Sequence, residues 1–108
     1  MRQMVILSKH LIVEFSIDDI SENRREEITT TIAKDAKRGV RLVTFNFDKI
    51  DTPFESSMIG LILGLCKFLV EKDITVRMEK LCEEAIGSLT VAGFHHFAQE
   101  HCIEMKTK

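Results

Sequence analysis

The sequence predicts an α/β domain in which a partly parallel β-sheet is covered by helices. Short segments rich in β-branched and aromatic residues alternate along the chain with longer segments of helical periodicity. Parallel strands need a long crossover between them, and a helix usually supplies it. Strands that alternate with helices of this length therefore imply βαβ units.

The composition predicts a single globular domain and argues against nucleic acid or an anionic membrane as a partner. The chain has 108 residues, of which 44% are hydrophobic and 30% are charged, so we expect one domain, residues 1–108, with its core between about residues 11 and 97. A net charge of −2 gives no basic surface for nucleic acid or for an anionic membrane. Trp and Tyr are absent, which removes the usual stacking platforms for single-stranded nucleic acid.

The first predicted strand and helix lie in the N-terminal half. Residues 11–15 form a short apolar run, which predicts a strand. Residues 21–37 carry apolar side chains at every fourth position from 28 to 36, and this spacing places them on one face of a helix. Gly39 is suited to the C-terminal cap of that helix.

The second strand and second helix form the centre of the predicted fold. Residues 40–47 are β-branched and aromatic, which favours a strand. Residues 58–71 are apolar nearly all round, which predicts a helix buried against the sheet. Gly60 and Gly64 are four residues apart, and we expect them to allow close approach of a neighbouring element because glycine has no side chain.

The last third of the chain predicts one more strand and helix. Residues 74–78 alternate in polarity and predict a strand. A last helix is expected over about residues 79–91 and should end at Gly93. Residues 94–102 are expected to form a short tail that packs back on the fold.

Cysteine use and hydropathy predict a cytoplasmic protein. Cys66, Cys82 and Cys102 are an odd number with no CxxC pair, which favours free thiols in a reducing compartment. The longest apolar run, residues 58–70, is shorter than the roughly 20 residues needed to span a bilayer. The N-terminus lacks the length and cleavage site of a signal peptide.

No motif in the sequence predicts catalysis, a metal or a cofactor. The four histidines include the neighbours His95 and His96, which point in different directions on a helix, and no HExxH or Cys/His cluster occurs. No Gly-rich phosphate loop or GxSxG elbow is present. We therefore expect a protein that is not an enzyme.

The loop at residues 48–57 concentrates polar side chains at a position where function is common. It joins the carboxyl end of a predicted central strand to the start of the most buried helix. A phosphate on a serine at a helix start is stabilised by free backbone N–H groups and by the helix dipole.

Two structural explanations of the same residues remain open. Ser56 or Ser57 could cap the helix through its hydroxyl. Alternatively, Thr52 and Glu55 fit a capping box with Pro53 at the first helical position, and the helix would then begin four or five residues earlier.

Several short motifs, in order along the chain, resemble the STAS family, the domain of bacterial anti-sigma factor antagonists. They are residues 17–18 (ID), 43–47 (VTFNF), 55–63 (ESSMIGLIL) and 89–94 (LTVAGF), followed by the apolar Phe97. The resemblance extends over nearly the whole chain and implies a STAS-like fold, a mixed β-sheet with helices packed on it.

The resemblance also implies a function in transcription regulation. Family members bind an anti-sigma factor that is also a serine kinase, and phosphorylation of a serine releases the partner. The matching residue is Ser57, with Ser56 as the alternative. We expect a monomer or homodimer whose partner-binding loop comprises Asp18, Asp48, Asp51, Thr52, Glu55, Ser56, Ser57 and Met58.

Two departures from the family pattern suggest alternative functions. Glu55 replaces the usual aspartate and Met58 replaces the glycine after the serine. Because the Met58 side chain could obstruct a kinase, a STAS subunit that binds its partner constitutively, without phosphorylation, is the second hypothesis. A sensor of a nucleotide or another small ligand, or a weak enzyme, that uses the same loop is the third.

Overall fold

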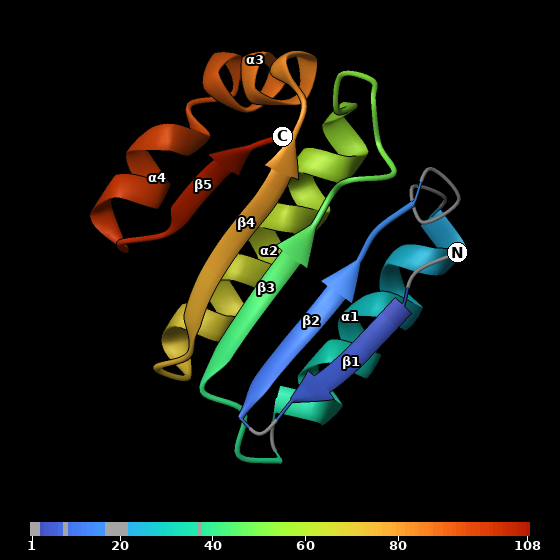
Figure 1. Ribbon diagram of the computed structural model, residues 1–108, viewed down its shortest axis with the longest axis vertical. Helices are drawn as coiled ribbons and strands as arrows, with labels where there is room; N and C mark the ends of the chain where they lie inside the picture. Colours follow the sequence, from blue (N-terminus) through green and yellow to red (C-terminus); the bar gives the residue numbers. More distant parts are fainter. Residues whose placement is uncertain (1–2, 8, 17–21, 37) are drawn as a thin grey trace.

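The computed structural model describes residues 3–7, 9–16, 22–36 and 38–108. Within these residues the chain forms an α/β domain in which strands and helices alternate through most of its length (Figure 1). In chain order the elements are β1 (Gln3–Leu7), β2 (His10–Glu14), α1 (Glu22–Ala36), β3 (Leu42–Asn46), α2 (Ser56–Glu71), β4 (Thr75–Leu81), α3 (Glu83–Val91), α4 (Phe94–Glu100) and β5 (Glu104–Thr107).

The strands form one mixed sheet in the order β1-β2-β3-β4-β5. β1 pairs with β2 in the antiparallel direction, and β2, β3, β4 and β5 run parallel. Leu11, Val43 and Val76 occupy one line across the three central strands. The expected partly parallel sheet is therefore confirmed, with β3 at its centre.

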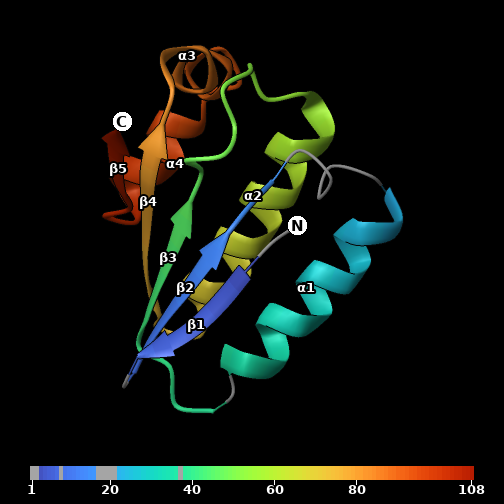
Figure 2. The ribbon, with the colours of Figure 1, turned by 45° about the vertical axis from the view of Figure 1, so that its right-hand side comes forward.

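The helices α1 and α2 cover one face of this sheet (Figures 1 and 2). Alternate strand residues, such as Val13, Phe45 and Met78, are completely buried beneath them. On the opposite face, Ile12 and Arg77 are half-buried, whereas Thr44, which lies between them on the central strand, is 1% exposed. The strands thus have one apolar face in the core and one face toward solvent, as expected for a sheet covered on one side.

The apolar periodicities of the first two helices produce the expected packing. Ile28 and Ile32 of α1 are fully buried, which confirms the predicted face of that helix. α2 buries Met58, Leu61, Ile62, Leu65, Cys66 and Leu69.

At Gly64 the expected close approach of a neighbouring element is not found among the described residues. Gly60 and Gly64 lie on the exposed side of the helix with Lys67. Apart from its chain neighbours and the backbone of the helix itself, no described heavy atom lies within 4 Å of the position that a Cβ of Gly64 would occupy. The helix buries its branched side chains, and the glycines lie on the side that remains toward solvent.

The C-terminal third differs from the prediction in three respects. β4 continues to Leu81, and α3 begins at Glu83, four residues later than expected. Lys80 has φ of +61° at a bulge in the pairing with β5, so the backbone there cannot start a helix. The expected tail is instead a helix, α4, followed by a fifth strand, and the core extends to Ile103.

Two of the three cysteines are buried, and all three are free. Burial raises the pKa of the Cys66 thiol to about 12, because the charged thiolate is poorly solvated in the core. Cys102 is exposed. None of the helices in the described residues is long and apolar enough to cross a membrane.

Removing a core side chain of α2 should cost much of the stability of the domain. Leu65 is 1% exposed, so Leu65→Ala should lower the free energy of unfolding by about 2–5 kcal/mol through lost burial and a cavity. Val91→Ala is the control: Val91 is 90% exposed, and its loss should change the free energy by no more than about 0.5 kcal/mol. Urea unfolding measures both, and equal effects would contradict the core assignment.

Cys102 should react with a thiol reagent much faster than Cys66 in the folded protein. At pH 8, iodoacetamide should label Cys102 in the native protein, and Cys66 only after unfolding, since the reactive species is the thiolate. The pKa of Cys66 in the folded protein lies above the ordinary value of 9.0. Its contribution to the stability of the fold is therefore complete below pH 9.0 and is lost as the pH rises toward 12. Labelling of Cys66 as fast as Cys102 in the native protein would contradict its placement.

Candidate functional site

The loop between β3 and α2 is fixed to the core by three apolar side chains. Phe47, Ile50 and Phe54 are at most 5% exposed. The ring of Phe47 lies between those of Phe15 and Phe54, with centroids 5.2 Å from each. Between these anchors the polar side chains of Asp48, Asp51 and Thr52 are exposed, and so is Glu55, directly after Phe54.

Backbone hydrogen bonds define the first turn of the loop. The Asp48 N–H donates to Oδ1 of Asn46 at 2.9 Å, and the Ile50 N–H donates to the Phe47 carbonyl at 3.0 Å. The Phe47 N–H donates to the Glu79 carbonyl at 3.1 Å, which continues the pairing between β3 and β4 beyond Asn46. The loop therefore begins as an ordered extension of the sheet.

Residues from the C-terminal part of the chain hold the rest of this loop. The Lys108 ammonium donates to the Asp48 carbonyl at 2.7 Å and pairs with the Asp51 carboxylate. The hydrogen bond to Asp51 raises the pKa of Lys108 above its ordinary value. The Cys82 thiol donates to the Thr52 carbonyl at 3.7 Å.

The first turn of α2 presents two serines. Glu55 occupies the position before the helix, with φ of −77° and ψ of 163°, and its carbonyl accepts the Ile59 N–H at 3.0 Å. Ser56 is the first helical residue and is exposed, and Ser57 is the second and is half-buried. The N–H groups at such a helix start have no partner within the helix and can bind an anion.

Both capping explanations of these residues are wrong. No side chain forms a capping hydrogen bond at the start of α2. Ser56 and Ser57 are already helical, so neither occupies the capping position. The helix does not begin near Pro53, and a box of Thr52 with Glu55 is therefore absent.

Met58 was expected in the partner-binding loop, but the structure does not place its side chain on the exposed surface. Its side chain is fully buried, because it lies on the same helix face as Ile62 and Leu65. The side chain therefore points away from the exposed Ser56 and cannot obstruct an approach from solvent. Asp18, also expected in this loop, lies outside the described residues.

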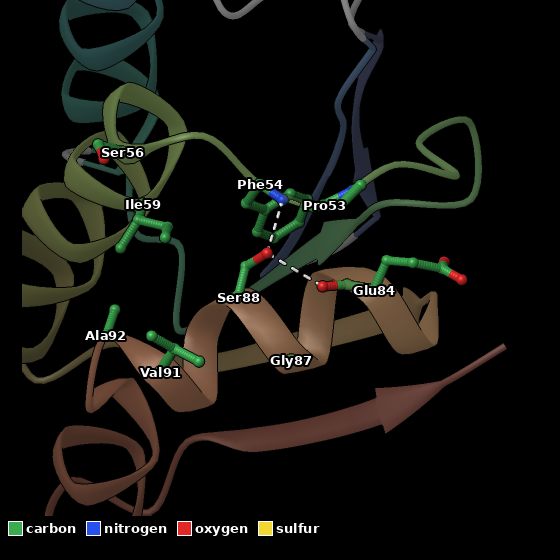
Figure 3. Close-up of a pocket in the computed structure, with 9 residues that line it drawn as sticks. All are labelled: Pro53, Phe54, Ser56, Ile59, Glu84, Gly87, Ser88, Val91 and Ala92. Carbon is green, nitrogen blue, oxygen red and sulfur yellow. Dashed lines mark hydrogen bonds between the residues drawn. The ribbon is translucent and has the colours of Figure 1, made fainter.

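A groove runs beside Ser56, between the start of α2 and α3 (Figure 3). Its volume is about 640 Å³, and its surface is mainly apolar. Val91 stands at one side of the groove and is 90% exposed. The lining residues are Pro53, Phe54, Ser56, Ile59, Glu84, Gly87, Ser88, Val91 and Ala92.

The sequence did not indicate this groove. The sequence predicts residues 79–91 only as a helix. The contact of this helix with a loop more than 30 residues earlier leaves no pattern in the local sequence. An apolar residue at position 91, near the end of a helix with exposed charges at its start, is the single hint of an exposed apolar surface.

The site offers hydroxyl groups, carboxylates, free N–H groups and an apolar groove. Across the described ranges, no three His, Cys, Asp or Glu side chains lie close enough to hold a metal ion together. The arrangement is suited to binding a protein surface and to accepting a phosphate on a hydroxyl.

Comparison with known proteins defines the class of fold. No protein-family model matches the sequence, and no curated protein sequence matches it either. Among solved structures, one that resembles the chain over its whole length is that of a regulatory protein. The chain therefore has a STAS-like fold.

That solved structure is the anti-sigma factor antagonist SpoIIAA in its unphosphorylated form. The TM-score is 0.62 at 17% sequence identity, with 100% of this chain and 88% of that chain covered. The fold expected from the motif resemblance is thus confirmed.

Removing the ammonium of Lys108 should loosen the loop locally. Lys108→Met leaves the Asp48 carbonyl and the Asp51 carboxylate without this donor, so the Asp48 and Ile50 amides should exchange with solvent faster. Because the pKa of Lys108 is raised, its contact should persist up to the ordinary lysine pKa of 10.5 and weaken only at higher pH.

Lys106→Met is the matched control, since Lys106 pairs with Glu104 on the same strand at 3.3 Å. It should leave exchange in the loop unchanged. Equal exchange rates in both variants, measured by NMR, would show that Lys108 does not order the loop.

Proposed function

We propose that this protein is an anti-sigma factor antagonist-like regulator that binds an anti-sigma factor with serine kinase activity and is switched by phosphorylation of Ser57. The proposal rests on one observation: an ordered acidic loop ends in two accessible serines at the start of a buried helix. The same fold occurs, over its whole length, in an anti-sigma factor antagonist.

The position of Ser57 suits a switch. It is half-buried at the second position of α2, so its hydroxyl is beside the free N–H groups of the first turn. A phosphate there would add about −1.5 to −2 charges at neutral pH. Glu55 is two residues away and Asp48 belongs to the same loop, whereas the Asp51 carboxylate is paired with Lys108. A phosphate on Ser57 would therefore increase like-charge repulsion with Glu55 and Asp48.

The partner would cover the exposed loop and the neighbouring groove. Apolar side chains of the partner would bury Val91 and the half-buried Ile59, and burial of apolar surface supplies most of the free energy of such contacts. Phosphate at Ser57 would then have to be desolvated in the complex, and the cost of desolvating it would release the partner.

In this proposal the protein acts by binding and not by catalysis. A partner that controls a bacterial sigma factor would place it in the cytoplasm. Constitutive binding without phosphorylation is the alternative, and the burial of Met58 removes the steric objection that favoured it.

Phosphorylation is tested with an anti-sigma factor of the serine-kinase class encoded in the same genome. Incubation with that kinase, ATP and Mg²⁺ should add one phosphate to the intact mass, and fragmentation should place it on Ser57. Ser57→Ala should remove the modification, whereas Ser56→Ala, the matched control one residue earlier, should retain it. Modification of Ser56 alone, or of neither serine, would contradict the assignment.

Binding separates the switch from the constitutive alternative. Ser57→Asp should weaken the complex about tenfold or more, since like charges brought together at an interface cost several kcal/mol. Ser57→Ala should leave the affinity nearly unchanged. Calorimetric titration measures both, and equal affinity of Ser57→Asp and wild type would favour a constitutive binder.

A further inference from the structure

We propose that Ser88 of α3 is a positioning residue, which fixes the backbone just before α2 and thereby sets the position of Ser56 and Ser57. The hydrogen bonds of the Ser88 hydroxyl to Glu84 and Phe54 support this placement. Its consequence for partner binding rests on the proposed function.

Ser88 bridges α3 and the loop with one hydroxyl group (Figure 3). Its O–H donates to the Glu84 carbonyl at 3.0 Å, and its oxygen accepts the Phe54 N–H at 3.1 Å. A serine hydroxyl has one proton and two lone pairs. With the proton directed to the Glu84 carbonyl, a lone pair remains for the Phe54 amide.

Phe54 is therefore held at two points. Its ring is 5% exposed and packs on Phe47, and its N–H is bound by Ser88. Only Glu55 separates Phe54 from the first residue of α2. These two contacts tie Phe54 to the core and to α3, and α2 begins two residues later at Ser56.

The same hydroxyl lies beside the groove, where Ser56 and Ser88 are both lining residues. A partner side chain that enters the groove meets α2 and α3 at the contact that joins them. Occupancy of the groove and the position of the two serines should therefore be coupled through this hydrogen bond.

α3 supplies a matched control in Thr90. Its hydroxyl forms the same bond to the carbonyl four residues earlier, Ile86, at 2.8 Å, but on an exposed part of the helix. Loss of either hydroxyl removes one such bond within α3. Only the loss of Ser88 removes the bond to the loop.

Amide hydrogen exchange of the wild type and variants tests the structural part. Ser88→Ala should increase the exchange rate of the Phe54 amide by about tenfold, the size expected for one lost hydrogen bond, with the urea midpoint close to that of Thr90→Ala. Ser88→Thr retains the oxygen and should restore slow exchange. An unchanged Phe54 rate in Ser88→Ala, or the same increase in Thr90→Ala, would overturn the proposal.

Kinase and binding assays test the functional part with the same variants. If Ser57 accepts phosphate, Ser88→Ala should change the KM for phosphorylation or the affinity for the kinase by about threefold or more, since couplings through one contact are typically of this size, and Ser88→Thr should restore it. If Ser88→Ala speeds exchange of the Phe54 amide but leaves the KM and the affinity at their wild-type values, the proposed effect of Ser88 on partner binding is wrong.

The failure of the proposed function gives a different result. If the wild type neither binds the kinase nor is phosphorylated, while the Phe54 amide exchanges faster in Ser88→Ala alone, Ser88 is confirmed as a positioning residue and the proposed partner is rejected.

Discussion

The burial of Phe54 against Phe47 is the contact on which the candidate site depends. The aromatic rings of Phe15, Phe47 and Phe54 form one series through the core at the carboxyl end of the central strands. This series fixes both ends of a loop whose other side chains are acidic or hydroxylic. A polar loop can be exposed and still be ordered here, because its apolar residues contribute to the core. Without that anchor, neither the groove nor the first turn of α2 would have a defined position relative to α3.

The remaining contacts of the loop come from the C-terminal part of the chain. Cys82, Ser88 and Lys108 bind the backbone or a carboxylate of the loop across 30 to 60 residues of sequence. Each contact is modest on its own: the bond of the Ser88 hydroxyl to the Phe54 amide, for example, is one hydrogen bond between uncharged groups, which contributes about 0.5–1.5 kcal/mol net. Together with the parallel pairing of β4 and β5, they make the site a product of the whole domain.

Local periodicity was sufficient for the central elements. β2, α1, β3 and α2 were predicted because their apolar side chains recur at strand or helix spacing and are buried in that pattern. The strands β1 and β5 were missed because edge strands depend on pairing that no short window reveals. The start of α3 was misplaced because Glu79 and Lys80 are compatible with a helix, whereas a positive φ at Lys80 keeps them in β4. The exposed loop residues were predicted from their position after a central strand. The prediction that Ser56 or Ser57 caps α2 was wrong, because no side chain caps this helix. The backbone before α2 is bound instead by Ser88, which is too distant in sequence for a local motif to indicate.

The central claim is that a protein partner binds the surface formed by the loop, the start of α2 and α3. The most direct measurement is an NMR titration of the isotope-labelled protein with an unlabelled serine-kinase anti-sigma factor from the same genome. The account predicts that shift changes and line broadening concentrate in residues 48–57 and 83–92. It also predicts that the half-exposed residues on the open face of the sheet, such as Ile12 and Arg77, change little. Changes concentrated on that open face, or no changes at saturating kinase, would contradict the account.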